Sequence, residues 1–264
     1  MANALHYPAG VQARFTKRLL KIVKVMRRHA EANIKRLFKS TEAKKYFATD
    51  ESFYARAQRL LDEMEKKYGT LFSTFGDAAV KQMIKETNKE SDIKMRAAFQ
   101  ELEKQYDIEI GFDIGEMPQK VRSILKASTE EAVSLIRSVP AKFLEYVKGD
   151  VFRAITSGKG GFSKIVESIK HYGSMSAGRA RRIAKDQTKK AFSSLNIAKA
   201  KGAGIQKGIW IHSGSPVHPR IKHKNFSGKV FDLSVGAPVG DRGQYVMPAE
   251  EPFCSCVWKP ILSF

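Results

Sequence analysis

The sequence predicts an α+β fold that is mainly α, with a helical N-terminal region followed by a small C-terminal α+β module with short strands. Two observations lead to this prediction. Over most of residues 11–200, apolar side chains recur in steps of three and four, which is the spacing of a helix with one buried face. After residue 204 that spacing stops, and short runs rich in Val, Ile, Trp and Phe alternate with Gly, Pro, Ser and Asp.

The first predicted helix follows Pro8 and Gly10, and its apolar stripe extends from Val11 to Leu37. The opposite face is basic. Such a face suits nucleic acid, an acidic protein surface or a membrane surface, but also a solvated helix in a bundle, and the sequence leaves these alternatives open. The candidate nucleic-acid or partner surface comprises Arg14, Lys17, Arg18, Lys21, Lys24, Arg27 and Arg28, together with Arg181 and Arg182 from a later helix. For the nucleic-acid alternative, the surface of that later helix extends to Arg179, Lys185, Lys189 and Lys190.

The middle of the chain is predicted to be a helical bundle without a catalytic centre. Residues 52–155 contain no His or Cys, and their paired carboxylates are adjacent in sequence, so they point in different directions on a helix. We expect Gly69 to end one helix, Ser91 to cap another and Pro140 to open a third. The predicted helices cover residues 52–68, 70–87, 91–106, 118–136 and 140–155.

The pattern divides the chain into three predicted parts. A helical region with a basic N-terminal helix covers residues 1–155, a Gly/Ser-rich junction covers 156–175, and a C-terminal module covers 176–264. The module begins with a long helix that ends near Gly202. Its predicted strands lie at 208–212 and 229–233, and Trp210, Phe231 and Trp258 are expected to form its core.

Positive charge is concentrated at the two ends of the chain, whose formal net charge is +20. Residues 1–50 carry 12 basic and 3 acidic side chains and residues 175–264 carry 15 and 5, whereas residues 51–174 carry 20 and 19. This distribution predicts a polyanionic partner, either nucleic acid or an acidic protein surface. No apolar run approaches the ~18–20 residues that cross a bilayer, so we expect no membrane span.

Histidine and cysteine cluster near the C-terminus. Two cysteines, Cys254 and Cys256, exclude a disulfide scaffold. Together with His223 they are candidate zinc ligands, because thiolate and imidazole suit tetrahedral zinc. The fourth ligand would be His218, His212 or Asp232. Alternatively, the thiols are small buried side chains, His223 forms a local hydrogen bond, and no cofactor is bound.

A catalytic interpretation has one candidate set, in which Cys254 or Cys256 acts as the nucleophile and His223 as the base. Arg220 would stabilise developing charge. Nothing in the sequence identifies a group that orients this histidine, so we expect no enzymatic activity and assign no catalytic residue.

Four segments of the C-terminal module, at residues 183–188, 208–210, 220–231 and 248–256, resemble in their order and spacing the phage Mu protein F-like family of minor head or phage head morphogenesis proteins. The chain departs from the family pattern at Lys185, Ser227, Phe253 and Ser255. The residues that match the family motifs are Asp186, Gln187, Trp210, Arg220, His223, Gly228, Phe231, Pro248, Cys254 and Cys256.

This resemblance implies a minor head (capsid) protein of a tailed phage, present in few copies near the portal vertex and acting in head morphogenesis. The implied partners are the portal protein or the capsid interior, with packaged double-stranded DNA as a further contact, and the implied location is the virion, after assembly in the host cytoplasm. The alternative is a basic nucleic-acid-binding protein without a structural role in the virion. The oligomeric state and any ejection with DNA stay open.

Overall fold

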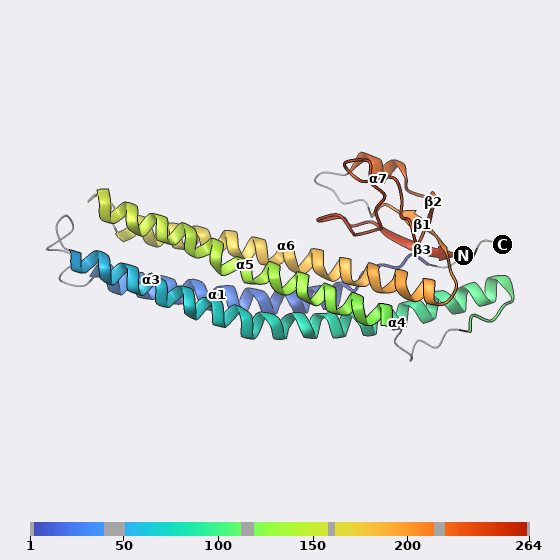
Figure 1. Cartoon of the computed structure of the whole chain (residues 1–264), viewed down its shortest axis with the longest axis horizontal. Helices are drawn as coiled ribbons and strands as arrows, with labels where there is room; N and C mark the ends of the chain where they lie inside the picture. The colour runs from blue at the N-terminus through green and yellow to red at the C-terminus, as the bar shows by residue number, and fades with distance from the viewer. Residues whose placement is uncertain (1–2, 40–50, 112–118, 158–161, 214–219, 263–264) are drawn as a thin grey trace. The chain divides into compact units, whose positions relative to one another are not determined.

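The computed structural model describes residues 3–39, 51–111, 119–157, 162–213 and 220–262. These residues are mainly helical, with one small antiparallel sheet near the C-terminus, so the predicted α+β class is confirmed (Figure 1). The helices are α1 (Ala9–Lys39), α3 (Glu51–Leu71), α4 (Asp77–Tyr106), α5 (Gln119–Ser157), α6 (Phe162–Gly202) and the short α7 (Ile221–Asn225). Among the described residues, no helix has the length and apolarity to cross a membrane.

Several predicted helix ends are wrong, because the helices continue through the residues expected to end or begin them. Gly69 lies inside α3, and a π-helical turn, Phe72–Gly76, joins α3 directly to α4. Ser91 is buried within α4 instead of capping a helix, and its hydroxyl donates to Asn196 Oδ1 at 2.6 Å. The side chain therefore has a partner that sequence periodicity does not reveal.

Two further boundaries also differ from the prediction. Pro140 lies inside α5. A proline in a helix interior costs about 3 kcal/mol. The burial of its neighbours Val139 and Phe143 offsets this cost. The predicted Gly/Ser-rich junction is helical from residue 162 onward, because α6 begins at Phe162. Residues 158–161 of that junction lie outside the described residues.

The chain folds into two compact units, each assembled from separate segments of the sequence. The helical unit comprises Arg14–Val80 and Glu131–Ala184. Within it, the ring of Tyr68 on α3 packs against His29 on α1 and Phe143 on α5, with ring centroids 5.6 and 6.4 Å apart. Ion pairs at its surface join Arg137 to Asp77 and Lys148 to Glu65. The predicted helical region of residues 1–155 thus contributes to both units, because residues 1–13 and 81–130 do not belong to this one.

The mixed unit comprises Met1–Ala13, Lys81–Glu130 and Lys185–Phe264, and it contains the sheet. The strands β1 (Lys207–Ile211), β2 (Val230–Asp232) and β3 (Val257–Ile261) pair antiparallel in the order β2-β1-β3. The sequence predicted β1 and β2 to within one residue at each end, but it did not predict β3. Figure 1 shows the three strands and α7 gathered in one region.

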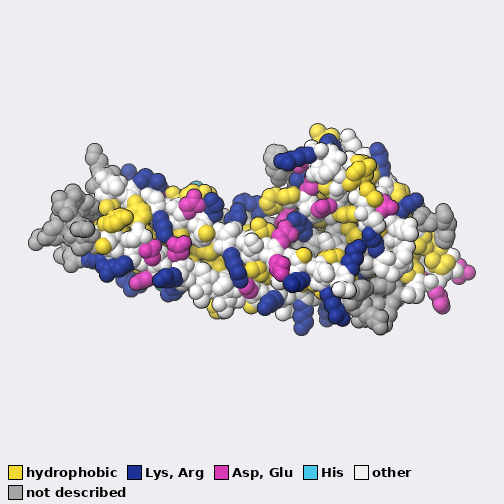
Figure 2. All heavy atoms as spheres, viewed as in Figure 1, with side chains coloured by type: hydrophobic (Ala, Val, Ile, Leu, Met, Phe, Trp, Pro, Cys, Tyr) yellow, Lys and Arg dark blue, Asp and Glu magenta, His cyan; other side chains and the backbone are white. Residues whose placement is uncertain are grey.

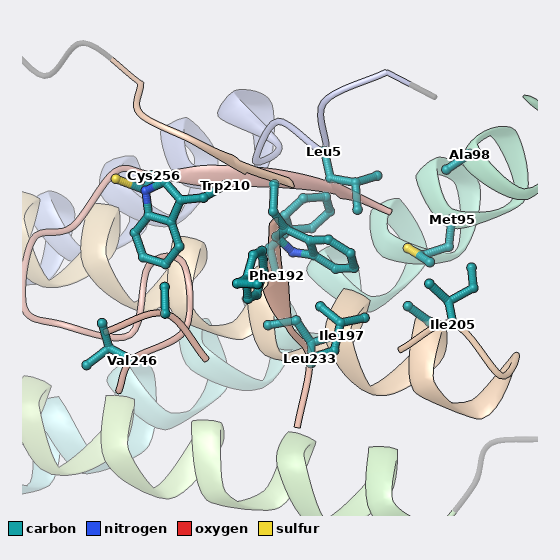
Figure 3. Close-up of a cluster of buried hydrophobic side chains, with 14 of the residues drawn as sticks. Leu5, Met95, Ala98, Phe192, Ile197, Ile205, Trp210, Leu233, Val246 and Cys256 are labelled. Atoms are coloured by element: carbon teal, nitrogen blue, oxygen red, sulfur yellow. The ribbon is translucent and has the colours of Figure 1, made fainter. Parts of the chain in front are cut away.

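The core of the mixed unit is aromatic, as the sequence predicted. Trp210 on β1 stands opposite Trp258 on β3, and both are fully buried. Phe231 on β2 packs edge-on against both indoles, at 5.8 and 6.2 Å between ring centroids. Figure 3 shows side chains from the N-terminal segment, α4, α6 and the strands meeting around this core, which includes Cys256.

A buried polar network fixes the C-terminal part of α6 against α4 within the mixed unit. Lys199 Nζ lies 2.6 Å from Asp92 Oδ1 and donates to Ser91 Oγ at 2.9 Å and Asn88 Oδ1 at 3.0 Å. A buried ammonium group that has several oxygen partners resists displacement, because each lost partner would leave an uncompensated charge. This network therefore joins the segment of α6 around Lys199 to α4.

Candidate functional site

His223, Cys254 and Cys256, the candidate zinc ligands, converge in the interior of the mixed unit. Both sulfur atoms lie 3.5 Å from His223 Nδ1, and the three atoms all lie within 4.8 Å of one another. His223 comes from α7, whereas the two cysteines precede β3, which begins at Val257. Because the Cys-Ser-Cys segment lies before the strand, the alternation of a strand does not send its two thiols to opposite faces.

Glu251 orients the histidine of this cluster. Its Oε2 lies 3.0 Å from His223 Nε2 and 3.2 Å from Arg220 Nε, and its Oε1 accepts from the backbone N–H of Asp241 at 3.1 Å. An ionised carboxylate accepts the Nε2 proton and leaves Nδ1 facing the two sulfur atoms. Arg220, predicted to stabilise developing charge, instead pairs with Glu251 and donates to the Pro252 carbonyl.

Sequence reasoning missed Glu251 and assumed that nothing orients His223, which is wrong. The sequence contains one signal that could have identified Glu251, because acidic residues are scarce around it: residues 175–264 contain only five acidic side chains. Glu251 is 8% exposed, and a buried carboxylate in so basic a segment requires a specific partner.

The electrostatics of the cluster follow from the closeness of its three groups. A hydrogen bond from Cys256 lowers the pKa of the Cys254 thiol well below its usual value, and His223 adds to the effect against the opposing influence of burial. The same hydrogen bond raises the pKa of Cys256, and so does burial. Burial would lower the pKa of His223, but the hydrogen bond and charge of Cys254 outweigh it, so that pKa is raised.

Of the three predicted fourth ligands, His212 lies at the cluster. It follows β1, and its Nδ1 lies 3.6 Å from Cys256 Sγ. Its backbone N–H donates to Ser227 Oγ at 3.0 Å. Asp232 is engaged elsewhere, because its Oδ1 accepts the N–H groups of Ser234 and Val235 in a turn. His218 lies outside the described residues.

The remaining motif residues form a frame around the cluster. Asp186 and Gln187 are buried neighbours on α6, and Asp186 Oδ1 accepts the N–H of Phe253 at 2.6 Å, next to Cys254. Ser193, which is also on α6, donates its hydroxyl hydrogen bond to the Pro248 carbonyl at 2.5 Å. Three more residues complete the frame. The ring centroid of Trp210 lies 5.2 Å from that of His223, and Phe231 packs on Trp210. Gly228 has a φ of +85°, which suits glycine, and its N–H donates to the Trp210 carbonyl.

Lys189 does not belong to a basic surface, contrary to the prediction. Its side chain is buried, its Nζ donates to Ser255 Oγ between the two cysteines, and the ammonium group lies 4.5 Å from the ring centroid of Tyr7. Burial lowers the pKa of Lys189 to about 8. Its place on the inner face of α6 could not be predicted from local charge pattern alone.

The basic face of α1 is largely exposed, as its helical spacing predicted. Lys17, Lys21, Lys24 and Arg28 are exposed there together with Arg14, and Arg181 and Arg182 are exposed on α6, whereas Arg18 and Arg27 are half-buried. On the face drawn in Figure 2, Lys and Arg side chains are spread among Asp and Glu rather than gathered in one block.

The arrangement supports two kinds of chemistry. A thiol, an imidazole and a carboxylate in sequence are the parts of a cysteine nucleophile with an oriented base. Two thiols and one imidazole nitrogen around a common point are the parts of a soft metal site. Cys254 and Cys256 are each 4% exposed, which suits a metal site better than a nucleophile that has to meet a substrate.

Comparison with known proteins leaves the family of the chain open. No family model matches it, and no solved structure matches it. An uncharacterized protein from Haemophilus influenzae is 29% identical over 139 residues, which cover 52% of this chain and 29% of that protein. The matched region thus spans less than a third of the length of that relative, and its description names no activity. The phage Mu protein F-like assignment therefore stays a prediction.

Proposed function

We propose that the chain is a minor head protein of a tailed phage that acts in head morphogenesis near the portal vertex. The observation that carries the proposal is that the motif residues, spread over residues 186–256, form one connected frame inside the mixed unit. Asp186 holds the segment that contains Cys254, and Trp210 packs beside His223. This connectivity is expected if the resemblance in motif order extends to the fold.

In this role the mixed unit docks on the portal protein or the capsid interior, and the exposed cations of the helical unit face an acidic partner or packaged DNA. The net charge of +20 supports such surroundings, because Lys and Arg gain free energy by displacing counterions or pairing with carboxylates. The function requires no catalytic step. It places the chain in the virion and, during assembly, in the host cytoplasm.

Quantitative mass spectrometry of gradient-purified proheads and virions tests this proposal. The particles are induced from a strain that encodes the chain, and its peptides are counted against those of the portal and major capsid proteins. We expect a few to a few tens of copies per particle. Absence from both proheads and virions would contradict a structural role in the head.

A second candidate is a nucleic-acid-binding protein without a role in the particle. The exposed row of Lys17, Lys21, Lys24 and Arg28 along α1 favours it, because successive cations on one helix face can contact successive phosphates. The two candidates differ in salt dependence. Binding through phosphates weakens steeply as salt rises, whereas docking through a packed protein interface largely persists.

A further inference from the structure

We propose that His223, Cys254 and Cys256 bind one Zn²⁺ ion, with His212 as the fourth ligand. The ion would fasten the Cys-Ser-Cys segment before β3 to α7 and to the end of β1. The inference rests on the geometry of the mixed unit and does not depend on a role in a phage particle.

The distances between the candidate ligand atoms match those of a tetrahedral zinc site. Zinc lies about 2.3 Å from sulfur and about 2.0–2.1 Å from nitrogen, so tetrahedral angles place neighbouring sulfur and nitrogen ligands about 3.6 Å apart. His223 Nδ1 lies 3.5 Å from each sulfur, and His212 Nδ1 lies 3.6 Å from Cys256 Sγ. Three edges of a zinc tetrahedron are therefore already present. His212 lies outside the cluster of three ligand atoms within 4.8 Å of one another, so it would have to move toward His223 and Cys254 to complete the site.

Glu251 provides the outer contact that a zinc-bound histidine requires. A ligating imidazole commonly donates its second N–H to a carboxylate, which sets the tautomer and strengthens the metal–nitrogen bond. Glu251 Oε2 lies 3.0 Å from His223 Nε2, opposite the nitrogen that faces the sulfur atoms. Arg220 in turn holds the carboxylate.

A second observation points to an anionic sulfur at the site. The indole Nε1–H of Trp210 is completely buried and has no well-aligned hydrogen-bond acceptor among the described residues. The group it approaches is the Cys256 thiol, and this interaction partly offsets the rise in the pKa of that thiol. Figure 3 shows this nitrogen beside the Cys256 side chain. A buried N–H without an acceptor is costly, and a zinc-bound thiolate is a much better acceptor than a neutral thiol.

Charge and ligand chemistry select zinc over other common cations. Two thiolates and two neutral imidazoles around Zn²⁺ have no net charge, which suits a site whose sulfur ligands are each 4% exposed. The negative charge of Glu251 is matched by Arg220. Ligands of sulfur and nitrogen disfavour Mg²⁺ and Ca²⁺, which prefer oxygen.

The primary test uses the unaltered full-length chain, purified without a metal-binding tag. Elemental analysis after dialysis against a weak chelator should find one zinc per chain. Replacement with Co²⁺ should give the ultraviolet charge-transfer absorption of thiolate ligands and the strong visible bands of tetrahedral cobalt. These readouts require no variant, so they are independent of any folding defect.

Matched variants then assign the ligands. Cys254→Ser and Cys256→Ser should each lose stoichiometric zinc and about half of the cobalt–thiolate absorption. Glu251→Gln should keep the spectrum but weaken zinc affinity about 10- to 100-fold, as loss of an outer carboxylate does elsewhere. His212→Ala should retain the thiolate absorption and change the visible bands. His171→Ala, at an exposed histidine of the helical unit, should change nothing.

Two results would overturn the proposal. If the unaltered chain holds no zinc, shows no cobalt–thiolate absorption and has thiols inert to alkylation, then the cysteines are simply buried side chains. If it holds no zinc and Cys254 is alkylated rapidly at neutral pH, then the cluster is a reactive thiol site. Circular dichroism of each variant distinguishes a lost ligand from a lost fold.

Discussion

Lys189 illustrates how one buried charge links pH to stability. The ammonium group is enclosed by Ser255 and Tyr7, and burial lowers its pKa to about 8 from an ordinary value of 10.5. Below pH 8 the folded and unfolded chains are both protonated at this group, and the folded chain bears the cost of the buried charge. Between pH 8 and 10.5 the folded chain releases the proton while the unfolded chain retains it, so this contribution stabilises the fold as pH rises.

We therefore expect the free energy of unfolding of the unaltered chain to rise relative to that of Lys189→Met between pH 8 and 10.5. The full difference is up to about 3 kcal/mol, at 1.36 kcal/mol per unit of pKa. Denaturant titrations of both proteins at several pH values measure it. Parallel stability profiles would show that Lys189 is not desolvated.

At the scale of elements, the continuous helical run from Glu51 to Tyr106 depends on how its two glycines pack. Gly69 lies in α3 with no atom within 4 Å of the position that a Cβ would occupy. Gly76 ends the π-helical turn, and a Cβ there would lie 2.9 Å from Ile136 Cγ2 on α5. The first glycine therefore only weakens the helix, whereas the second allows two helices of the helical unit to approach closely.

The two glycines predict opposite effects of the same substitution. Gly69→Ala should raise the free energy of unfolding by about 0.5–1 kcal/mol, because alanine favours the helix and nothing obstructs its methyl group. Gly76→Ala should lower it by about 1–3 kcal/mol, because Ile136 is fully buried and has to move. Urea denaturation followed by circular dichroism tests both. Stabilisation by Gly76→Ala would contradict the close packing of Gly76 against Ile136.

At the scale of the whole molecule, the net positive charge of +20 can attract a polyanion in two ways. One defined basic surface can bind it, or the total excess of Lys and Arg over Asp and Glu can attract it without a defined surface. The exposed cations of α1 belong to the helical unit, whereas Lys81, Lys85, Lys89 and Arg96 are exposed on α4 in the mixed unit. The set of Lys17, Lys21, Lys24 and Arg28 on α1 has the same formal charge as this α4 set, so the two form a matched pair for substitution.

If α1 contacts DNA phosphates, replacing Lys17, Lys21, Lys24 and Arg28 with Gln should weaken duplex binding. It should also reduce the slope of log K against log salt by about 3 to 4, at about 0.9 for each phosphate that is no longer neutralised. The same replacement of the α4 set should leave the slope nearly unchanged. Fluorescence anisotropy at several salt concentrations gives both slopes. Equal reductions would mean that charge alone attracts DNA without a defined surface.

Features that depend on local pattern could be predicted from the sequence: the helical character of most of the chain, the aromatic core of the mixed unit, the exposed cations of α1 and the metal-binding composition of His223, Cys254 and Cys256. Periodicity reports which face of a helix is buried, and residue type reports which atoms could act as ligands. Neither requires knowledge of distant neighbours.

Only the tertiary structure decided where helices continue and which groups complete the site. Gly69, Ser91 and Pro140 carry strong local signals for helix ends, yet α3, α4 and α5 pass through them. Glu251 is 28 residues from His223, and Lys189 is 66 residues from Ser255. Partnerships across such separations form when folding buries polar groups that then require each other, and a linear pattern holds no record of that requirement.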